Sequence, residues 1–455
     1  MNWQPDTTDA AETAVGRPGT PSLKGLAVRG SAWTIIGFGI AQALRLGGNL
    51  ILTRLLFPEA FGIMALVEMV MHGIQMFSDM GLGTGVVRDP RGDDPRFFNT
   101  AWTLQVIRGC GLWLLTCIAA FPVSIAYQEP VLMQLLPLTG LSALIQGFTS
   151  TSVLSLRRNV NLKPLVIWEI ASQAFGLLCL IALAWSMRSV WALALGAVIR
   201  MSVAMITSRF LIRGRKFRFA WDRSALRELL RFGKWIFLSS AMTFIIQQGD
   251  RALLGLFVTK QALGLFAIAT VWSRMAIQAL NQLNGRVLLP IYANIHNSSH
   301  ARLRGRVFQA RLWLICMFVP AMWVLSLGGQ WLIDLLYDPR YTEAGWMLQL
   351  LAAGAVGSII SATAGNILLV VGDSRRFMVL QTGRSLILVV CIAIGASQAG
   401  VVGMVVGVAI SRVADYPLLA WAIRRHGMWM PVLDLGTLAL SAAAILTGCL
   451  FFGLI

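Results

Sequence analysis

The chain has 455 residues, of which 57% are hydrophobic and 13% charged, and its mean hydropathy is +0.71. At this length the composition excludes a soluble protein. The net charge of +18 lies mainly in short gaps between apolar stretches, where it suits anionic lipid headgroups and does not indicate nucleic-acid binding.

The N-terminal segment 1–29 is polar, which predicts a disordered tail and not a signal peptide. Beyond it, apolar stretches long enough to cross a hydrocarbon core of about 30 Å as helices recur to the C-terminus. The predicted spans are Ser31–Leu52, Ala60–Gly83, Phe98–Val123, Val131–Val153, Leu165–Trp185, Val190–Leu211, Phe232–Phe257, Ala262–Leu289, Val307–Leu327, Ala344–Val371, Phe377–Ala396, Val401–Ile423 and Val432–Phe452. We therefore expect an all-α, polytopic membrane protein of 12–14 transmembrane helices.

Every second gap is rich in Lys and Arg, whereas each intervening gap has at most one basic residue. Because basic loops mark the cytoplasmic side, the N-terminal tail is predicted to be cytoplasmic. The most basic gap divides the chain, and the predicted parts are an N-lobe of six spans (30–212), a basic cytoplasmic linker (213–231), a C-lobe of six spans (232–425) and an additional C-terminal helix (426–455).

The two predicted lobes carry a repeat. Trp235 and Gly264 in the second lobe follow Trp33 and Gly62 in the first by the same 202 residues. With six spans in each, the lobes have the same orientation, which predicts a two-fold axis along the membrane normal. Such duplications are typical of carriers whose halves move about a central site.

Ionisable residues within apolar spans are costly and tend to face an interior cavity. Most of them here are arginines, which favours an anionic ligand because guanidinium groups bind phosphate bidentately and stay protonated. The candidate substrate-binding residues are Arg45, Asn49, Arg108, Arg251, Arg274 and Arg384. Asp79 and Asp250 are candidates for coupling or gating, and Arg412 and Asp415 are predicted to form a local ion pair.

The sequence has no Walker A, HExxH or GxSxG motif, and its six cysteines show no metal-binding or disulfide spacing. We therefore expect neither catalytic residues nor a metal or cofactor, and the chain is not predicted to be an enzyme.

Short motifs add a family resemblance. The stretches Gly30–Trp33, Leu52–Gly62, Asp79–Gly83 and Asn99–Trp102 resemble those of the polysaccharide (O-antigen-type) flippases, and Gly249–Arg251 resembles their second-half counterpart. The most specific part is the Leu-Leu-Phe-Pro-Glu-Ala-Phe-Gly sequence that ends at Gly62. These flippases share a superfamily with the multidrug and toxin extrusion carriers and the lipid II flippases.

The resemblance implies two pseudo-symmetric six-helix lobes around a V-shaped central cavity. It implies translocation of an oligosaccharide on undecaprenyl diphosphate across the bacterial inner membrane, for O-antigen, capsule or exopolysaccharide synthesis, with a proton or sodium gradient as the drive. Membrane lipids and a polysaccharide polymerase or export machinery are the other implied partners. Two alternatives stay open: a cation-coupled drug or small-molecule antiporter of the same superfamily, and a membrane polysaccharide polymerase or ligase.

Overall fold

The computed structural model describes residues 23–78, 95–150, 162–211, 243–293, 300–365, 367–371 and 373–451, together with positions 153, 156 and 219. Within these ranges the first helices are α1 (Leu23–Leu55), α2 (Pro58–Phe77), α4 (Pro95–Ala126), α5 (Leu132–Gly147), α7 (Leu162–Met187) and α8 (Val190–Ser208). The later ones are a helix at 243–257, α10 (Lys260–Ala293), α11 (His300–Leu336), η2 (Pro339–Tyr341), α12 (Ala344–Gly365), α13 (Ile367–Val371), α14 (Ser374–Ala414), α15 (Tyr416–Arg424) and α16 (Pro431–Phe451). Each predicted span overlaps at least one of these helices, and α14 extends over two of the spans.

Long apolar helices dominate the fold because only a helix satisfies its own backbone hydrogen bonds in a lipid core. By length and composition, nine helices in the described part of the chain can cross a membrane. The longest of them, Arg375–Arg424, reverses direction where Ala399 and Gly400 leave the helical conformation. Gly400 has a φ of +53°, which glycine adopts without the steric cost that a Cβ brings.

The helices on either side of this reversal pack closely. A Cβ added at Gly403 would overlap the backbone of Gly395, and one added at Gly407 would overlap the carbonyl group of Cys391. The small-xxx-small spacing of Gly403 and Gly407 therefore serves helix packing, as their sequence spacing predicts.

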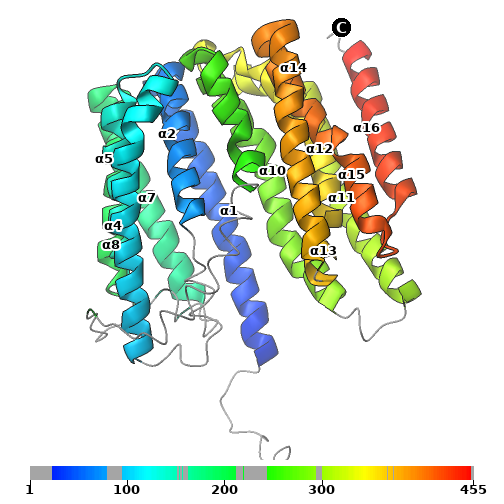
Figure 1. Cartoon of the computed structure of the whole chain (residues 1–455), viewed down its shortest axis with the longest axis horizontal. Helices are drawn as coiled ribbons and strands as arrows, with labels where there is room; N and C mark the ends of the chain where they lie inside the picture. Colours follow the sequence, from blue (N-terminus) through cyan, green and yellow to red (C-terminus); the bar gives the residue numbers. More distant parts are fainter. Residues whose placement is uncertain are drawn as a thin grey trace, which may run out of the picture.

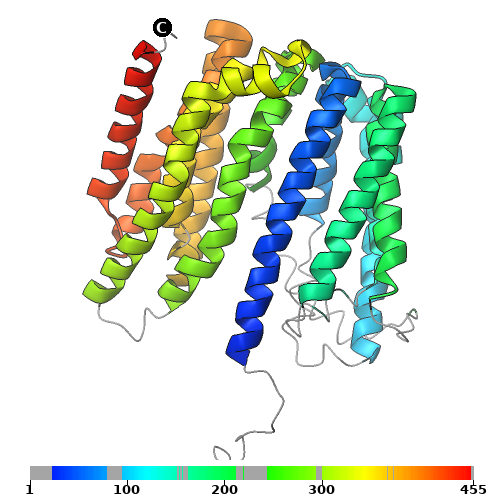
Figure 2. The same ribbon diagram turned by 180° about the vertical axis from the view of Figure 1, so that it is seen from behind.

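The described helices form two lobes, which Figures 1 and 2 show side by side from opposite faces. The N-lobe consists of α1, α2, α4, α5, α7 and α8, and the C-lobe consists of the helix at 243–257 and α10 to α15. α16 lies at the edge of the C-lobe and contacts α11 and α12. Residues 1–22 of the predicted tail and nearly all of the predicted linker lie outside the described residues. α1 begins at Leu23, inside the segment predicted as tail, because apolar residues resume there.

The two lobes meet most closely where α2 packs against α10. A Cβ added at Gly62 would overlap the carbonyl oxygen of Lys260, and one added at Gly264 would overlap that of Pro58. Pro58 and Lys260 are 202 residues apart, as are Gly62 and Gly264. The contact of Gly62 with Lys260 and the contact of Gly264 with Pro58 are therefore equivalent positions of the repeat. This is how two-fold-related lobes pack at their common axis.

We expect Gly62→Ala to force α2 and α10 apart and to lower the free energy of unfolding by about 1–3 kcal/mol. The unfolding temperature of the purified protein in detergent measures this loss. Gly39→Ala on α1 is the matched control, since nothing lies within 4 Å of a Cβ added there. Equal unfolding temperatures for the two variants would contradict the close approach of the two lobes at this point.

Candidate substrate-binding cavity

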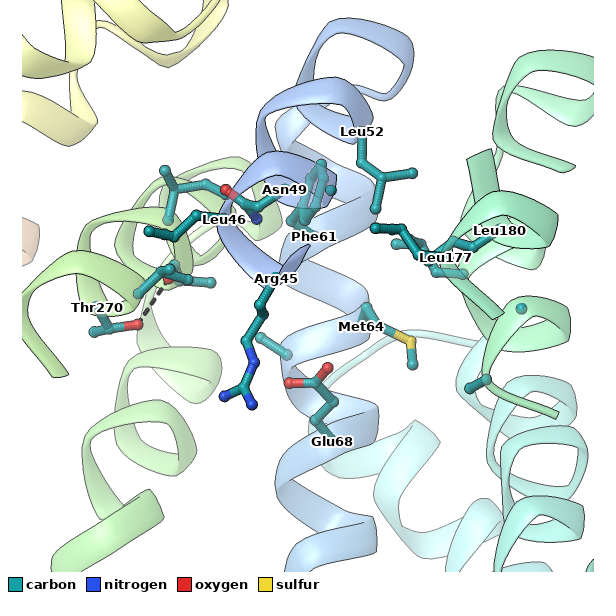
Figure 3. A pocket seen from close by; sticks show the side chains of 18 of the residues that line it. Arg45, Leu46, Asn49, Leu52, Phe61, Met64, Glu68, Leu177, Leu180 and Thr270 are labelled. Carbon is teal, nitrogen blue, oxygen red and sulfur yellow. Dashed lines mark hydrogen bonds between the residues drawn. The ribbon is translucent and has the colours of Figure 1, made fainter. Parts of the chain in front are cut away.

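A cavity of about 760 Å³ lies between the two lobes, and we call it the central cavity. Four different helices each contribute an arginine to its lining: Arg45 from α1, Arg200 from α8, Arg251 from the helix at 243–257 and Arg274 from α10. Figure 3 shows Arg45 projecting from α1 into this space, with the carboxylate of Glu68 on α2 directed toward it. The centre of the bundle is therefore polar and mainly cationic.

Two of these four arginines have acidic partners. Asp250 is 3% exposed and accepts a hydrogen bond of 2.6 Å from Nη2 of Arg274. Nη1 of Arg251 lies 3.5 Å from Oε2 of Glu68, which makes an ion pair across the lobe interface. Among the described residues, neither Arg45 nor Arg200 forms an ion pair within 4 Å; Glu68, which is directed toward Arg45, pairs with Arg251. These two guanidinium groups are available to an anionic ligand.

A second cavity of about 760 Å³ lies nearer the end at which α1 begins, and we call it the N-lobe cavity. Its α1 lining runs from Thr34 to Arg45, and Gln282 of α10 is the one lining residue from the C-lobe. Arg45, Gln173 and Arg200 line both cavities, so the two spaces meet at these residues.

The lining of the two cavities has a clear excess of positive charge. Five arginines and two glutamates contribute to it: Arg45, Arg108, Arg200, Arg251 and Arg274 against Glu68 and Glu169. Low-dielectric walls strengthen the attraction of such a cleft for an anion. Guanidinium groups also match phosphate oxygens in geometry and do not deprotonate. The cavities therefore suit a phosphate-bearing ligand and disfavour a cation.

The central cavity brings together four of the residues predicted from sequence: Arg45, Asn49, Arg251 and Arg274. Arg108 lines the N-lobe cavity, where it donates hydrogen bonds of 3.1 Å to Oγ of Ser78 and to the carbonyl oxygen of Gln75. Asp250 is buried beneath Arg274 and is not part of either lining. Asp79 lies outside the described residues.

Arg384 is placed elsewhere in the C-lobe, outside both cavity linings. Its Nε lies 2.7 Å from Oδ2 of Asp415, and Oδ1 of the same carboxylate accepts a hydrogen bond of 3.2 Å from Oγ of Ser361. Arg412 instead donates to the carbonyl oxygen of Leu351, so the predicted pair between Arg412 and Asp415 is wrong. The helix is interrupted at Asp415, where α14 ends and α15 begins, so the three-residue spacing does not bring the two side chains together.

Hydrogen bonds join the two lobes at the end that carries η2, which we call the Tyr341 end. Tyr341 is fully buried and donates a hydrogen bond of 2.8 Å to the carbonyl oxygen of Leu56 in the N-lobe. Burial raises the pKa of Tyr341, so its hydroxyl stays protonated and remains a donor. Tyr337 donates a hydrogen bond of 2.8 Å to Oδ1 of Asn49 in the lining of the central cavity. These contacts join the two lobes beside the central cavity.

The family model described as "polysaccharide biosynthesis protein" matches residues 51–345, which is well over half of the chain. The chain belongs to this family. Its curated relative WzxC of Escherichia coli strain K12, a lipopolysaccharide biosynthesis protein, is 22% identical over 446 residues, which cover 93% of this chain and 88% of WzxC.

Two solved structures share the fold of the present protein. A lipid II flippase MurJ in an inward closed conformation superposes with a TM-score of 0.71 at 12% identity, over 92% of each chain. An inward-facing multidrug resistance MATE family transporter of the MOP superfamily superposes with a TM-score of 0.66 at 15% identity, over 86% of this chain and 97% of its own. The protein therefore has the same two-lobed helical fold as these structures.

Arg200 is the cavity residue that the sequence analysis missed. A signal exists, because it is the eleventh residue of the predicted span Val190–Leu211. Its side-chain stem packs over Gly176 of α7, where an added Cβ would lie 2.5 Å from Cγ of Arg200. Because Gly176 has no side chain, α7 leaves room for the arginine on α8. No sequence pattern predicts that Gly176 and Arg200 lie next to each other.

Proposed function

We propose that the protein translocates an undecaprenyl-diphosphate-linked oligosaccharide across the bacterial inner membrane, from the cytoplasmic to the periplasmic leaflet, for the synthesis of O-antigen, capsule or exopolysaccharide. The single observation that carries this proposal is the pair Arg45 and Arg200, two cationic side chains in a cavity between two lobes and without carboxylate partners among the described residues. A diphosphate is the anion that two such guanidinium groups fit best.

The physical problem for such a carrier is the polar headgroup, since the lipid tail stays in the hydrocarbon. Moving an ionised diphosphate and hydrated sugars into an apolar medium is prohibitively costly. Arginines in the cavity replace the lost hydration, and a seal that alternates between the two ends prevents a continuous channel. The contacts at the Tyr341 end then belong to the form that is open toward the other end.

Asp250 suits a gating role better than a site for a coupling cation. Its carboxylate already holds Arg274 of α10, and its Oδ1 accepts a hydrogen bond of 2.8 Å from the backbone N–H of Arg251. A movement of the helix at 243–257 relative to α10 breaks the bond to Arg274 and exposes both charges.

Ligand discrimination in detergent tests the proposal. We expect a polyprenyl diphosphate-linked oligosaccharide to raise the unfolding temperature of the purified protein, because a ligand that binds only the folded state stabilises it. The lipophilic cation tetraphenylphosphonium serves as the comparison and is expected to have no effect. If only tetraphenylphosphonium raised the unfolding temperature, the proposal would be wrong and a cation antiporter would be indicated.

The alternation of basic gaps also sets an expected orientation, with the Tyr341 end on the periplasmic side. A reporter fused after Arg340 should therefore report the periplasm, and one fused after Arg223 should report the cytoplasm. Alkaline phosphatase and green fluorescent protein fusions provide complementary signals. If both positions report the same compartment, the orientation is wrong.

A further inference from the structure

The N-lobe cavity differs in chemistry from the central cavity that it joins. Glutamine amides from five helices line it: Gln75 of α2, Gln105 of α4, Gln146 of α5, Gln173 of α7 and Gln282 of α10. An amide both donates and accepts hydrogen bonds, as a sugar hydroxyl does, whereas guanidinium groups only donate. The cavity volume of about 760 Å³ is also within the range of ligand-binding pockets, about 300–1,000 Å³.

Three of these amides have no hydrogen-bond partner in the described part of the chain. The side chains of Gln75, Gln146 and Gln282 make no hydrogen bond to any part of the chain that the structure describes. By contrast, Nε2 of Gln105 donates to the carbonyl oxygens of Gln146, Gly147 and Thr149, each at 3.1 Å, which fixes the end of α5. Gln75, Gln146 and Gln282 therefore line the cavity with side-chain amides that no described residue engages.

The cavity also contains a fixed aromatic side chain. Trp168 of α7 is half-buried in the lining, and its Nε1–H donates a hydrogen bond of 2.9 Å to Oγ1 of Thr207 on α8. With its polar group occupied, the indole offers the cavity an apolar surface, the kind of surface against which the C–H face of a pyranose ring packs.

We propose that the N-lobe cavity is a subsite for the sugars of the substrate, separate from the diphosphate site at the arginines. This proposal rests on the proposed function. Arg45 and Arg200 stand where the two cavities meet, so a diphosphate held there places the sugar attached to it in the N-lobe cavity. Figure 3 agrees with this direction, since the guanidinium of Arg45 points away from Asn49 and Leu52. The glycan is then recognised almost entirely by the N-lobe.

Two lipid probes separate the subsites: a polyprenyl diphosphate without sugar, and the same lipid diphosphate carrying a neutral disaccharide. Binding of each to the purified full-length protein is measured by titration. We expect the wild-type protein to bind the glycosylated probe more tightly. The double variant Gln75→Leu/Gln146→Leu should bind the glycosylated probe about ten-fold more weakly, from the loss of two hydrogen bonds, with unchanged binding of the bare diphosphate.

Unchanged binding of the bare probe also reports that the variant is folded. If the double variant does not fold, the single variant Gln282→Leu, whose side chain is exposed, takes its place with a proportionally smaller effect. Gln398→Leu makes the same substitution at an exposed position outside both cavities and should alter neither affinity. Equal weakening of both probes, or no weakening, would overturn the sugar subsite. Failure of the wild-type protein to bind either probe would instead overturn the proposed function, and the subsite with it.

Discussion

Replacing Arg45 or Arg200 by glutamine is expected to slow translocation of a lipid diphosphate-linked oligosaccharide at least about ten-fold, because each change removes charge-assisted hydrogen bonds worth about 1.5–3 kcal/mol. Glutamine is shorter than arginine and uncharged, so at position 200 it adds nothing to the close approach of Arg200 and Gly176. The initial rate in sealed vesicles that contain the purified variant measures the effect.

The matched control for this experiment is Arg209→Gln. Arg209 follows α8 directly, is exposed and lines neither cavity, so its loss should leave the rate unchanged. Wild-type rates for both Arg45→Gln and Arg200→Gln would show that the cationic cavity does not hold the substrate.

The second large effect is expected at the pair that joins α16 to the C-lobe. Nη2 of Arg311 on α11 lies 2.5 Å from Oδ1 of Asp434 on α16, and their side chains are 1% and 0% exposed. Arg311→Met leaves a buried carboxylate without its counter-charge, which costs about 3–5 kcal/mol of stability. A lower unfolding temperature in detergent reports this loss.

The double variant Arg311→Met/Asp434→Leu removes both charges and should recover most of the stability, since apolar side chains replace a buried ion pair at little cost. Asp338→Asn, which breaks the half-exposed pair with Arg340, provides the comparison and should cost less than about 1 kcal/mol. If Arg311→Met and the double variant unfold at the same temperature, the pair does not hold α16 in place.

The helices and the two-lobed fold are predictable from sequence because lipid imposes strong local constraints. A span must be long, apolar and helical, so each predicted stretch overlaps a described helix, including the two stretches that Gly400 separates. The 202-residue repeat predicts two related lobes, and Gly62 and Gly264 meet at the lobe interface. The spans follow from the composition of each segment, and the lobes follow from the constant spacing of 202 residues between their equivalent positions.

Partner identities are not predictable in this way because they depend on how helices distant in sequence are placed. Arg384 and Arg251 are both arginines within predicted spans, yet one pairs with Asp415 inside the C-lobe and the other lines the central cavity and pairs with Glu68. Arg200 shows the reverse case: it lies within a predicted span, but its place in the cavity lining depends on how α8 packs against α7. The sequence indicates which residues carry charge into the membrane, and the packing decides which of them meet the substrate.

Translocation by the wild-type protein tests the central claim most directly. Sealed vesicles are prepared with a lipid diphosphate-linked oligosaccharide in one leaflet, and a membrane-impermeant glycosidase probes the other. The account predicts that the sugar becomes accessible at a rate that depends on the protein and exceeds that of protein-free vesicles. Sugar that stays inaccessible would contradict the account, and sugar that stays in place while its chain lengthens would identify a polymerase.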